Sequence, residues 1–536
     1  MIQKTIPYHL WAMLGFVYLI ALFMPLMEND SAQFAVMAMR MAQENDFIHL
    51  FKDGLDYLDK PHMHYWLAAI SFKLFGYAAW AYRLPSFLAL IAGAYALYRL
   101  GAQLKSKMLG RWSAFVFLSF QTMVLASFDL RTDSLLSSFV AIALWKLISY
   151  VRYLKWSDAL IGATAAGLAF STKGMIALVV LGFAVLSYAL VEGRIRSLFS
   201  IKVVGALAVF ALTITPILYA YYQQFDLHPE KVIRGLSGRS GIRFILWDQS
   251  FERLSGTGHG KSSSGYFFFF HTLLWVLLPF TFYTLKGWVN VFRRSFGSRQ
   301  PLFFAGMALI PLFLLMSASQ FKLPHYLNIL MPLFALLTAR ELEDLSQDSR
   351  IAGLKIAHLG IAILYGASVL ILWVVFTPTL TTVGVALGWG ALLLYLKMRK
   401  TAGLTFGWIG SALLFNAMAF IHFYPQLLNY QSGQVLTDRI PTEAKVFNYS
   451  DDYLWSLEFG RKQLSVPKHT YDIHSLSSGA YVYVDTKHYA SFKALYPHAV
   501  EWASASHFRI TQLSISFLKK SSREEQLSLK RIMIVP

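Results

Sequence analysis

Long blocks of apolar residues recur along the chain from residue 8 to residue 422, and they leave few ways for it to fold. About thirteen blocks are roughly 17–22 residues long, the length of an α-helix that crosses the hydrocarbon core of a bilayer. Inside the hydrocarbon core each segment must pair its own backbone N–H and C=O groups, so each block is predicted to be a helix. Only 14% of the residues are charged, against about 25% in soluble domains. We therefore expect an all-α polytopic membrane protein with about 13 transmembrane helices.

The formal net charge of +19 comes from basic residues that cluster at the ends of alternate apolar blocks, as in Arg99–Arg111 and Arg194–Lys202. This is the positive-inside pattern of a membrane protein and not the basic face of a nucleic-acid-binding protein. It predicts a cytoplasmic N-terminus. No small-residue cleavage site follows the first block, so we expect this block to be retained as a helix. An odd number of crossings then places the C-terminal segment outside the cytoplasm. The sequence contains no cysteine, which excludes disulfides and thiolate metal sites.

Two long outer loops interrupt the predicted transmembrane domain, residues 1–428. Loop 28–83 contains two semi-apolar, aromatic-rich stretches, Phe34–Met41 and Met63–Phe75. Both are too short to cross a bilayer and are predicted to form interfacial helices. Loop 223–265 is polar and ends in a Gly/Ser-rich segment, which predicts a mobile region.

The apolar blocks end before residues 429–536. In this segment, Ala480–Val484 and the alternating pattern at Phe508–Ile515 predict β-strands. We therefore expect residues 429–536 to form a small soluble α/β domain on the extracytoplasmic side of the membrane.

Several acids and bases stand beside the predicted outer ends of the apolar blocks. Asp30 follows the first block, where a carboxylate can be a helix cap or a general base at the mouth of a cavity. Lys60 belongs to the polar and aromatic run 57–66, and it is either a cation that reaches the lipid interface or part of an anion-binding site. Asp133 begins a predicted helix, where the helix dipole favours an acid whatever its function.

Taken together, these groups carry more information than each one alone, because the predicted topology places all of them on the outer side. Cations beside carboxylates at a membrane face suit a lipid phosphate and an acid–base step. The cations would bind the phosphate and stabilise it as a leaving group, and a carboxylate would deprotonate the acceptor. The set consists of Asp30, Lys60, Arg131, Asp133, Lys173, Asp248, Arg253, Lys322 and Tyr326.

Over about residues 1–430 the chain resembles the GT-C glycosyltransferases, the superfamily of protein O-mannosyltransferases and aminoarabinose–lipid A transferases. The resemblance rests on family motifs that recur in order. In this chain they are Asp30 with Phe34–Met41, Tyr57–Pro61, Asp133, Thr172–Gly174 and Lys322–Tyr326. The chain departs from the family pattern at Ser31 and at Gln33-Phe34, next to the expected sugar contacts.

The resemblance implies roles for these residues. Asp30 would be the catalytic base that activates the acceptor oxygen for in-line attack on the anomeric carbon, with inversion and departure of polyprenyl phosphate. Asp133 would be the second catalytic acid, supporting the site. The donor phosphate would be held by Tyr57, Lys60, Arg253, Lys322 and Tyr326, supported by Arg131 and Lys173.

In some relatives a loop-one acid and a residue of the later outer loop bind a metal, and Asp59 and Asp248 match those positions. A divalent metal is therefore allowed but not required, because two oxygen ligands make a weak zinc site.

The resulting hypothesis is a glycosyltransferase of the bacterial inner membrane with a periplasmic active site. It would transfer sugar from a polyprenyl (undecaprenyl) phosphate carrier to a lipid A, glycolipid or protein acceptor. The alternative is a lipid-carrier flippase or transporter, a class that usually places ionisable residues at mid-membrane and uses internal repeats. The sequence leaves open the sugar, the acceptor and the oligomeric state.

Overall fold

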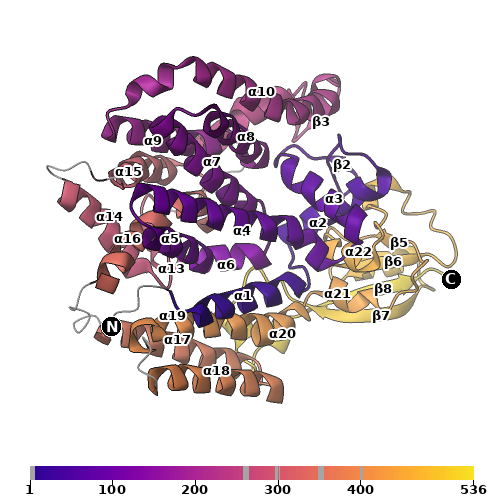
Figure 1. Ribbon diagram of the computed structural model, residues 1–536. Helices are drawn as coiled ribbons and strands as arrows, with labels where there is room; N and C mark the ends of the chain where they lie inside the picture. The colour runs from indigo at the N-terminus through magenta and orange to yellow at the C-terminus, as the bar shows by residue number, and fades with distance from the viewer. Residues whose placement is uncertain (1–5, 258–264, 296–299, 301, 348–354, 399–402) are drawn as a thin grey trace.

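The computed structural model describes residues 6–257, 265–295, 300, 302–347, 355–398 and 403–536. Most of the Gly/Ser-rich end of the second predicted loop, residues 258–264, lies outside these ranges. Helices form most of the molecule, and a small sheet lies at one end, beside the C-terminus (Figure 1).

The first part of the chain is helical apart from two short hairpins, β1 (Phe51–Lys52) with β2 (Leu55–Asp56) and β3 (Val232–Ile233) with β4 (Leu236–Ser237). Its helices are α1 (Tyr8–Phe23), α2 (Asp30–Glu44), α3 (Met63–Phe75), α4 (Ala79–Leu104), α5 (Lys107–Ser119), α6 (Gln121–Phe128), α7 (Asp133–Tyr153), α8 (Trp156–Lys173), α9 (Ile176–Val191), α10 (Ile201–Tyr221), α11 (Gly241–Arg243), α12 (Gln249–Ser255), α13 (Phe268–Val276), α14 (Thr281–Ser295), α15 (Phe303–Ala318), α16 (Met331–Gln347), α17 (Lys355–Val375), α18 (Leu380–Met398), α19 (Gly403–Met418) and α20 (Tyr424–Leu428). Shorter helical turns are η1 (Ile195–Phe199), η2 (Tyr222–Asp226), η3 (Phe244–Asp248), η4 (Pro324–Leu330) and η6 (Ala419–Phe423).

Several of these helices are long and apolar enough to cross a membrane. In the described part of the chain, five qualify on their own, and seven do if two bent pairs each count as one crossing. The pair α5–α6 bends by 53° and the pair α13–α14 by 118°. Pro279 lies between α13 and α14. Proline has no N–H group, so it cannot donate the backbone hydrogen bond that a continuous helix would have at this position. Two predicted crossings are thus broken helices, and the full number of crossings stays a prediction.

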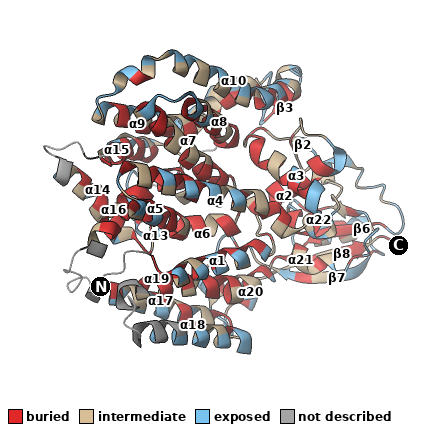
Figure 2. Ribbon diagram, viewed as in Figure 1, coloured by how far each residue is buried: buried red, intermediate tan, exposed pale blue. Residues whose placement is uncertain are grey.

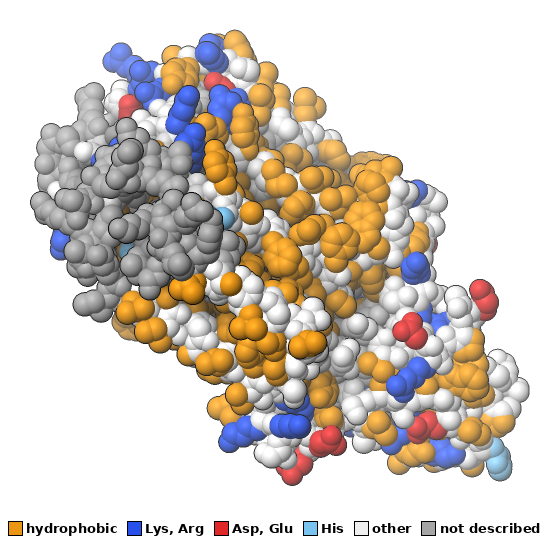
Figure 3. Space-filling view, turned by 60° about the horizontal axis from the view of Figure 1, so that its bottom comes forward, with side chains coloured by type: hydrophobic (Ala, Val, Ile, Leu, Met, Phe, Trp, Pro, Cys, Tyr) orange, Lys and Arg blue, Asp and Glu red, His pale blue; other side chains and the backbone are white. Residues whose placement is uncertain are grey.

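The outer helices expose much apolar surface. In the most apolar 18 residues of the crossing at 201–226 only 11% of the residues are buried inside the protein, and in the crossing at 358–375 only 17% are. Figure 2 shows this exposure along α10, and Figure 3 shows hydrophobic side chains over the middle of one face, with charged side chains toward its ends. An apolar surface of this extent is typical of contact with lipid.

The two predicted short helices of the first loop are confirmed as α2 and α3. α2 begins at Asp30, and its buried residues include Phe34, Met37 and Met41. The helix is therefore enclosed by other parts of the protein and does not lie exposed at a surface. The position before it, Asn29, makes no side-chain capping bond, and Asp30 contributes an acid to the first turn, where the helix dipole favours it.

The C-terminal part of the chain contains a four-stranded sheet in the order β5-β6-β8-β7, with β5 and β6 parallel and the other pairs antiparallel. Val482 and Val484 pack on one face with Phe492, and Tyr483 packs on the other with Leu457, so both faces of β6 are buried. The elements are β5 (Val446–Asn448), β6 (Tyr481–Asp485), β7 (Val500–His507), β8 (Ser528–Ile534), α21 (Ser432–Thr437), α22 (Trp455–Arg461), α23 (Tyr489–Leu495) and α24 (Ile515–Leu518), with the short turns η7 (Lys468–Thr470) and η8 (Glu524–Gln526).

One of the two predicted C-terminal strands is confirmed, because Ala480–Val484 overlaps β6. The other, Phe508–Ile515, is wrong, since the strand in this region ends at His507. The Phe508 ring stacks on Phe517 at 3.8 Å between ring centroids. Phe508 thus packs this loop onto α24, while Leu513 and Ile515 are exposed, and the alternating apolar residues do not form a strand. That residues 429–536 form a separate soluble domain stays a prediction.

The C-terminal part packs directly against the start of α2. α2 lies against α22, and the Gln431 side-chain oxygen accepts a hydrogen bond from the Glu28 backbone N–H at 2.6 Å. The Ser456 hydroxyl donates to the Glu28 carboxylate. The segment that leads into Asp30 is therefore held by residues more than 400 positions away in sequence.

Candidate active site

Residues that lie far apart in the sequence meet where several helices begin or end. Asp30 is the first residue of α2, and Asp133 is the first residue of α7. Lys173 is the last residue of α8, Arg253 lies in α12, and Tyr326 lies in η4. Tyr57, Asp59 and Lys60 come from the loop between β2 and α3. Helix ends place charged side chains at the edge of the apolar region without breaking the helices themselves.

Asp59 is the centre of one group of contacts. Its carboxylate lies 2.8 Å from Arg253 Nη2 and 3.4 Å from Lys60 Nζ. The Tyr57 hydroxyl donates to the same carboxylate at 3.3 Å, and the Gln249 side-chain amide donates to the Asp59 carbonyl. Burial, reinforced by the charge of Asp59, raises the pKa of Tyr57 well above its usual range, so this hydroxyl stays protonated and remains a donor.

The electrostatics of Lys60 tie this group to the rest of the site. Burial, together with the nearby charge of Arg253, lowers the pKa of Lys60 to about 8, although Asp59 opposes the change. Lys173 and Asp30 also act on this ammonium. Lys60 is therefore mostly charged at pH 7 and loses its charge a little above it.

Arg131 connects Asp30 to a second acid. Arg131 Nη1 lies 3.3 Å from the Asp30 carboxylate, and Nη2 lies 3.0 Å from Asp129. His325 Nδ1 is 3.4 Å from Arg131 Nη1, and burial lowers the pKa of His325 well below its usual range, which leaves the ring neutral. The Asp30 side chain is 41% exposed, so a substrate group can reach it.

Asp133 and Lys173 form a buried ion pair. The two charged atoms are 2.5 Å apart, and the side chains are only 3% and 6% exposed. The Lys173 ammonium also lies 5.2 Å from the centre of the Tyr326 ring. Gly174, which ends α8, has a φ of +76°, and a Cβ there would lie 2.3 Å from the Gln249 side-chain oxygen. A glycine is thus needed for α8 to end beside α12.

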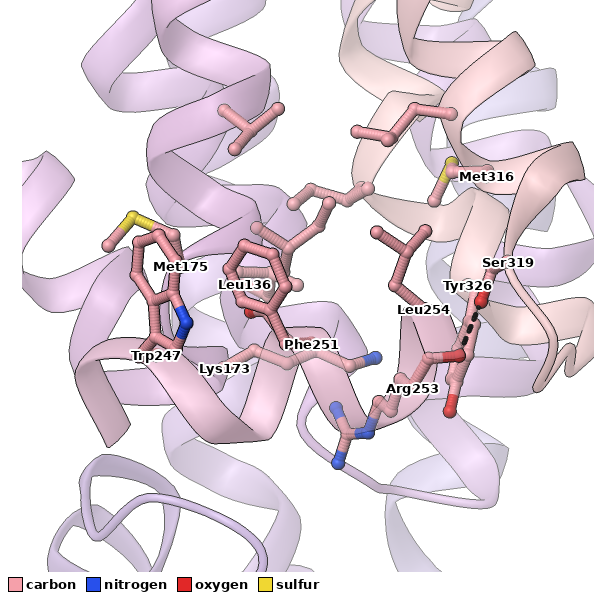
Figure 4. A pocket seen from close by; sticks show the side chains of 15 residues that line it. Leu136, Lys173, Met175, Trp247, Phe251, Arg253, Leu254, Met316, Ser319 and Tyr326 are labelled. Carbon is pink, nitrogen blue, oxygen red and sulfur yellow. Dashed lines mark hydrogen bonds between the residues drawn. The ribbon is translucent and has the colours of Figure 1, made fainter. Parts of the chain in front are cut away.

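An apolar cavity of about 340 Å³ adjoins these groups. In Figure 4 the side chains of Leu136, Leu254 and Met316 surround the cavity, and those of Lys173 and Arg253 reach its lower edge. These two cations are the only charged residues among the described residues that line it. The buried Arg253 Nε also has no hydrogen-bond partner in the part of the chain that the structure describes. The site thus combines an apolar chamber with cationic groups at its edge.

Two further predicted residues have other contacts in the described part of the chain. Asp248 pairs at 3.3 Å with Arg243, an exposed residue of its own segment. Lys322 is buried, and its ammonium lies 5.6 Å from the centre of the Tyr266 ring.

The two acids suggested as metal ligands have cationic partners, Asp59 with Arg253 and Asp248 with Arg243. No group of three or more His, Cys, Asp or Glu side chains suited to a metal occurs in the described ranges. Both acids are thus already paired with cations, and metal binding stays a prediction.

The sequence reasoning did not assign three residues that contribute to the site. Asp129 and His325 both contact Arg131. In the sequence, Asp129 stands two residues before Arg131, and His325 directly precedes Tyr326. Arg83 in α4 is buried and donates to the carbonyls of Pro25 and Phe128, each at 3.0 Å. It holds the two segments that lead to Asp30 and Arg131. An arginine inside an apolar helix was the signal that could have found it.

Comparisons with known proteins show what the chain as a whole is similar to. A family described as dolichyl-phosphate-mannose-protein mannosyltransferase matches residues 59–220. The undecaprenyl phosphate-alpha-4-amino-4-deoxy-L-arabinose arabinosyl transferase of Yersinia pestis (strain Pestoides F) is 25% identical over 358 residues, 64% of this chain and 60% of the relative. The protein of the same name from Serratia proteamaculans (strain 568) is 28% identical over 62% of this chain and 59% of its own length. The chain thus matches less than two thirds of each relative.

Two solved structures are similar in fold. ArnT from Cupriavidus metallidurans, in a crystal structure bound to undecaprenyl phosphate, has a TM-score of 0.72 and 16% identity over 98% of this chain and 97% of that chain. The apo oligosaccharyltransferase of Archaeoglobus fulgidus has a TM-score of 0.50 and 13% identity over 91% of this chain and 71% of that chain. At these identities the likeness concerns the fold.

Proposed function

This chain belongs to the GT-C superfamily, and from that premise we propose that it is an inner-membrane glycosyltransferase that takes sugar from a polyprenyl phosphate carrier, with undecaprenyl phosphate as the carrier lipid. One observation carries the proposal furthest. The apolar cavity is lined by two cations, Lys173 and Arg253, and by no acid among the described residues. An isoprenoid tail with a phosphate head matches that combination of an apolar chamber and a positive edge.

The reaction we propose is a single displacement. Asp30 takes the proton from the acceptor hydroxyl, and the acceptor oxygen forms a bond to the anomeric carbon on the face opposite the phosphate. The bond between that carbon and the phosphate oxygen breaks, and polyprenyl phosphate leaves with the electron pair. Inversion at the anomeric carbon follows from attack on the opposite face.

The other residues serve this step through charge. Arg253 and Lys60 stabilise the negative charge that develops on the leaving phosphate, aided by Tyr57, Tyr326 and Lys322. Arg131 orients the Asp30 carboxylate through their contact at 3.3 Å. The buried pair of Asp133 and Lys173 supports the floor of the site.

We place this site on the periplasmic side, with the N-terminus in the cytoplasm. Residues 1–428 form the catalytic transmembrane domain, with about 13 crossings, and residues 429–536 form an extracytoplasmic domain. The acceptor is a lipid such as lipid A. The apolar cavity, with its two cations, supports the donor assignment, and the names of the relatives support the sugar class, an amino-arabinose.

The proposal is tested with the purified chain in detergent, an undecaprenyl-phosphate-linked amino-arabinose and lipid A. We expect a glycosylated lipid A, detected by mass spectrometry, and stoichiometric release of undecaprenyl phosphate. Movement of the carrier lipid across vesicles without a new glycosidic bond would instead favour the flippase hypothesis.

The lowered pKa of Lys60 predicts a pH dependence of donor use. Below about pH 8 the ammonium is charged and attracts the phosphate, and above it the group becomes neutral, so kcat/KM for the donor is expected to fall as pH rises through 8. In Lys60→Arg the guanidinium stays charged at all these pH values, so the fall should disappear. A pH profile with the same alkaline limb in both proteins would argue against Lys60 as a phosphate ligand.

A further inference from the structure

Two polar cavities border the C-terminal part of the chain, on the side of the molecule where it meets α2 and the first loop. The first, here the Asn29 cavity, has a volume of about 510 Å³ and is lined by Glu28 and Asn29, the two residues before Asp30. The second, here the Tyr57 cavity, has a volume of about 720 Å³ and is lined by Tyr57. The Tyr57 cavity thus reaches a residue of the candidate active site, and the Asn29 cavity reaches the segment that leads into Asp30. Neither is the apolar cavity described above.

A single short segment separates the two cavities. Asp451, Asp452 and Tyr453 line both of them, so this segment is their common wall. It belongs to the C-terminal part, between β5 and α22. The wall thus faces both the cavity next to Asn29 and the cavity next to Tyr57.

The wall carries a supported aromatic ring. Tyr453 is 50% exposed, and its ring stacks on that of Trp455 at 4.2 Å between centroids with an angle of 8°. Trp455 is buried and donates its indole N–H to Asp53 at 3.1 Å, and the Lys52 ammonium lies 4.3 Å from the centre of the Tyr453 ring. The exposed ring is thus held in place by a buried ring and by the β1–β2 hairpin, before any ligand arrives.

The lining around this ring offers hydrogen-bond acceptors and donors in near-equal number. Asp53 and Asp56 face the Tyr57 cavity, together with Lys231, whose ammonium lies 3.2 Å from Asp56. Asp485 and Lys530 face the Asn29 cavity. Carboxylates accept from hydroxyl groups, and ammonium groups donate to them. Paired charges of this kind suit a ligand with many hydroxyl groups better than one with a single strong charge.

From this arrangement we propose that Tyr453 is a stacking platform for the sugar headgroup of the acceptor, and that the Asn29 and Tyr57 cavities hold the adjoining sugar hydroxyls. The C–H face of a pyranose is apolar and covers an aromatic ring, while its rim of hydroxyls meets the carboxylates and ammonium groups. The acceptor class is therefore a saccharide-bearing molecule, and the residues that select it come from the C-terminal part of the chain.

This inference rests on the proposed function, and it assigns the donor and the acceptor to different cavities. The donor lies against the apolar cavity at Lys173 and Arg253, and the acceptor lies in the polar cavities beside Tyr453 and Asn29. Asp30 follows Asn29 directly in the chain. A change at Tyr453 should then affect the acceptor and leave the donor untouched.

The test uses the full-length chain carrying Asp30→Asn, so that binding is measured without turnover. The probe is the water-soluble glucosamine disaccharide obtained by removing the acyl chains from lipid A. Tyr453→Ala is expected to raise its Kd by about five- to tenfold, the range of an aromatic stacking contact. Tyr453→Phe keeps the ring and should retain the original Kd.

Trp502→Ala is the matched control. Trp502 is also 50% exposed and also belongs to the C-terminal part, but it lines neither cavity. Its removal should leave the Kd unchanged. The thermal unfolding midpoint of each variant distinguishes a lost contact from a misfolded C-terminal part. In the chain with Asp30 intact, Tyr453→Ala should raise KM for lipid A while KM for the donor stays the same.

An unchanged Kd in Tyr453→Ala overturns the inference. So does a chain that transfers sugar to a peptide and shows no binding of the disaccharide, because the acceptor would then be a protein. A third outcome is that the disaccharide binds with a Kd that Tyr453→Ala raises while the unmodified chain transfers no sugar from the lipid carrier. In that case the saccharide site stands and the proposed function fails.

Discussion

Replacing Asp30 by Asn is expected to slow sugar transfer by about a hundred- to ten-thousandfold, the contribution of a general base. The amide has the same shape as the carboxylate, but it cannot accept the proton of the acceptor hydroxyl. Asp30 is at the start of α2 and 41% exposed, so the substitution buries no new polar group and the chain should still fold. The measurement is the single-turnover rate with donor and acceptor both saturating, which isolates the chemical step from binding.

Asp129→Asn provides a matched control for this prediction. Asp129 contacts the same arginine, Arg131, at 3.0 Å. Its substitution makes the same change, from carboxylate to amide, at a neighbouring acid. If Asp30 is the base, Asp129→Asn should cost far less activity than Asp30→Asn. Equal losses in the two variants would mean that charge around Arg131 matters and that neither acid is the base. Full activity in Asp30→Asn would remove it from the mechanism.

Breaking the buried pair of Asp133 and Lys173 is expected to destabilise the fold by about 3–5 kcal/mol. Asp133→Ala leaves the Lys173 ammonium, which is 6% exposed, without its partner 2.5 Å away. Lys173→Met likewise leaves the buried Asp133 carboxylate without its cationic partner. The double variant, Asp133→Leu with Lys173→Met, removes both charges and should recover most of the loss, because a paired apolar replacement leaves no uncompensated charge. Unfolding in mixed detergent micelles measures each free energy.

Glu501→Ala is the contrasting case for this prediction. Glu501 pairs with Arg531 at 3.1 Å on the C-terminal sheet, with a 41% exposed carboxylate. An exposed pair is worth at most about 1 kcal/mol, so this variant should unfold close to the unmodified chain. Should the single variants at Asp133 and Lys173 behave like Glu501→Ala, the pair would not be a structural support. A double variant that is stable but inactive would assign the pair a role in catalysis.

Several parts of the fold and the site were predictable because they depend on local sequence. Apolar blocks form helices since each pairs its own backbone groups, and α2 and α3 appear at the predicted stretches of the first loop. The residue types of the site were also visible, because cations and acids next to apolar blocks are few. The Phe508–Ile515 strand was wrong because alternation also arises when a loop packs aromatic rings onto a helix.

What the sequence determined by itself is thus the chemical inventory: apolar helices, helix ends that carry Asp30, Asp133 and Lys173, and cations suited to a phosphate. Only the tertiary structure decided which groups meet. Asp59 pairs with Arg253 across 194 positions, and the segment before Asp30 is held by Gln431 and Ser456. The reason is physical, since helix formation depends on neighbours along the chain, whereas a carboxylate finds its partner only after distant helices have packed.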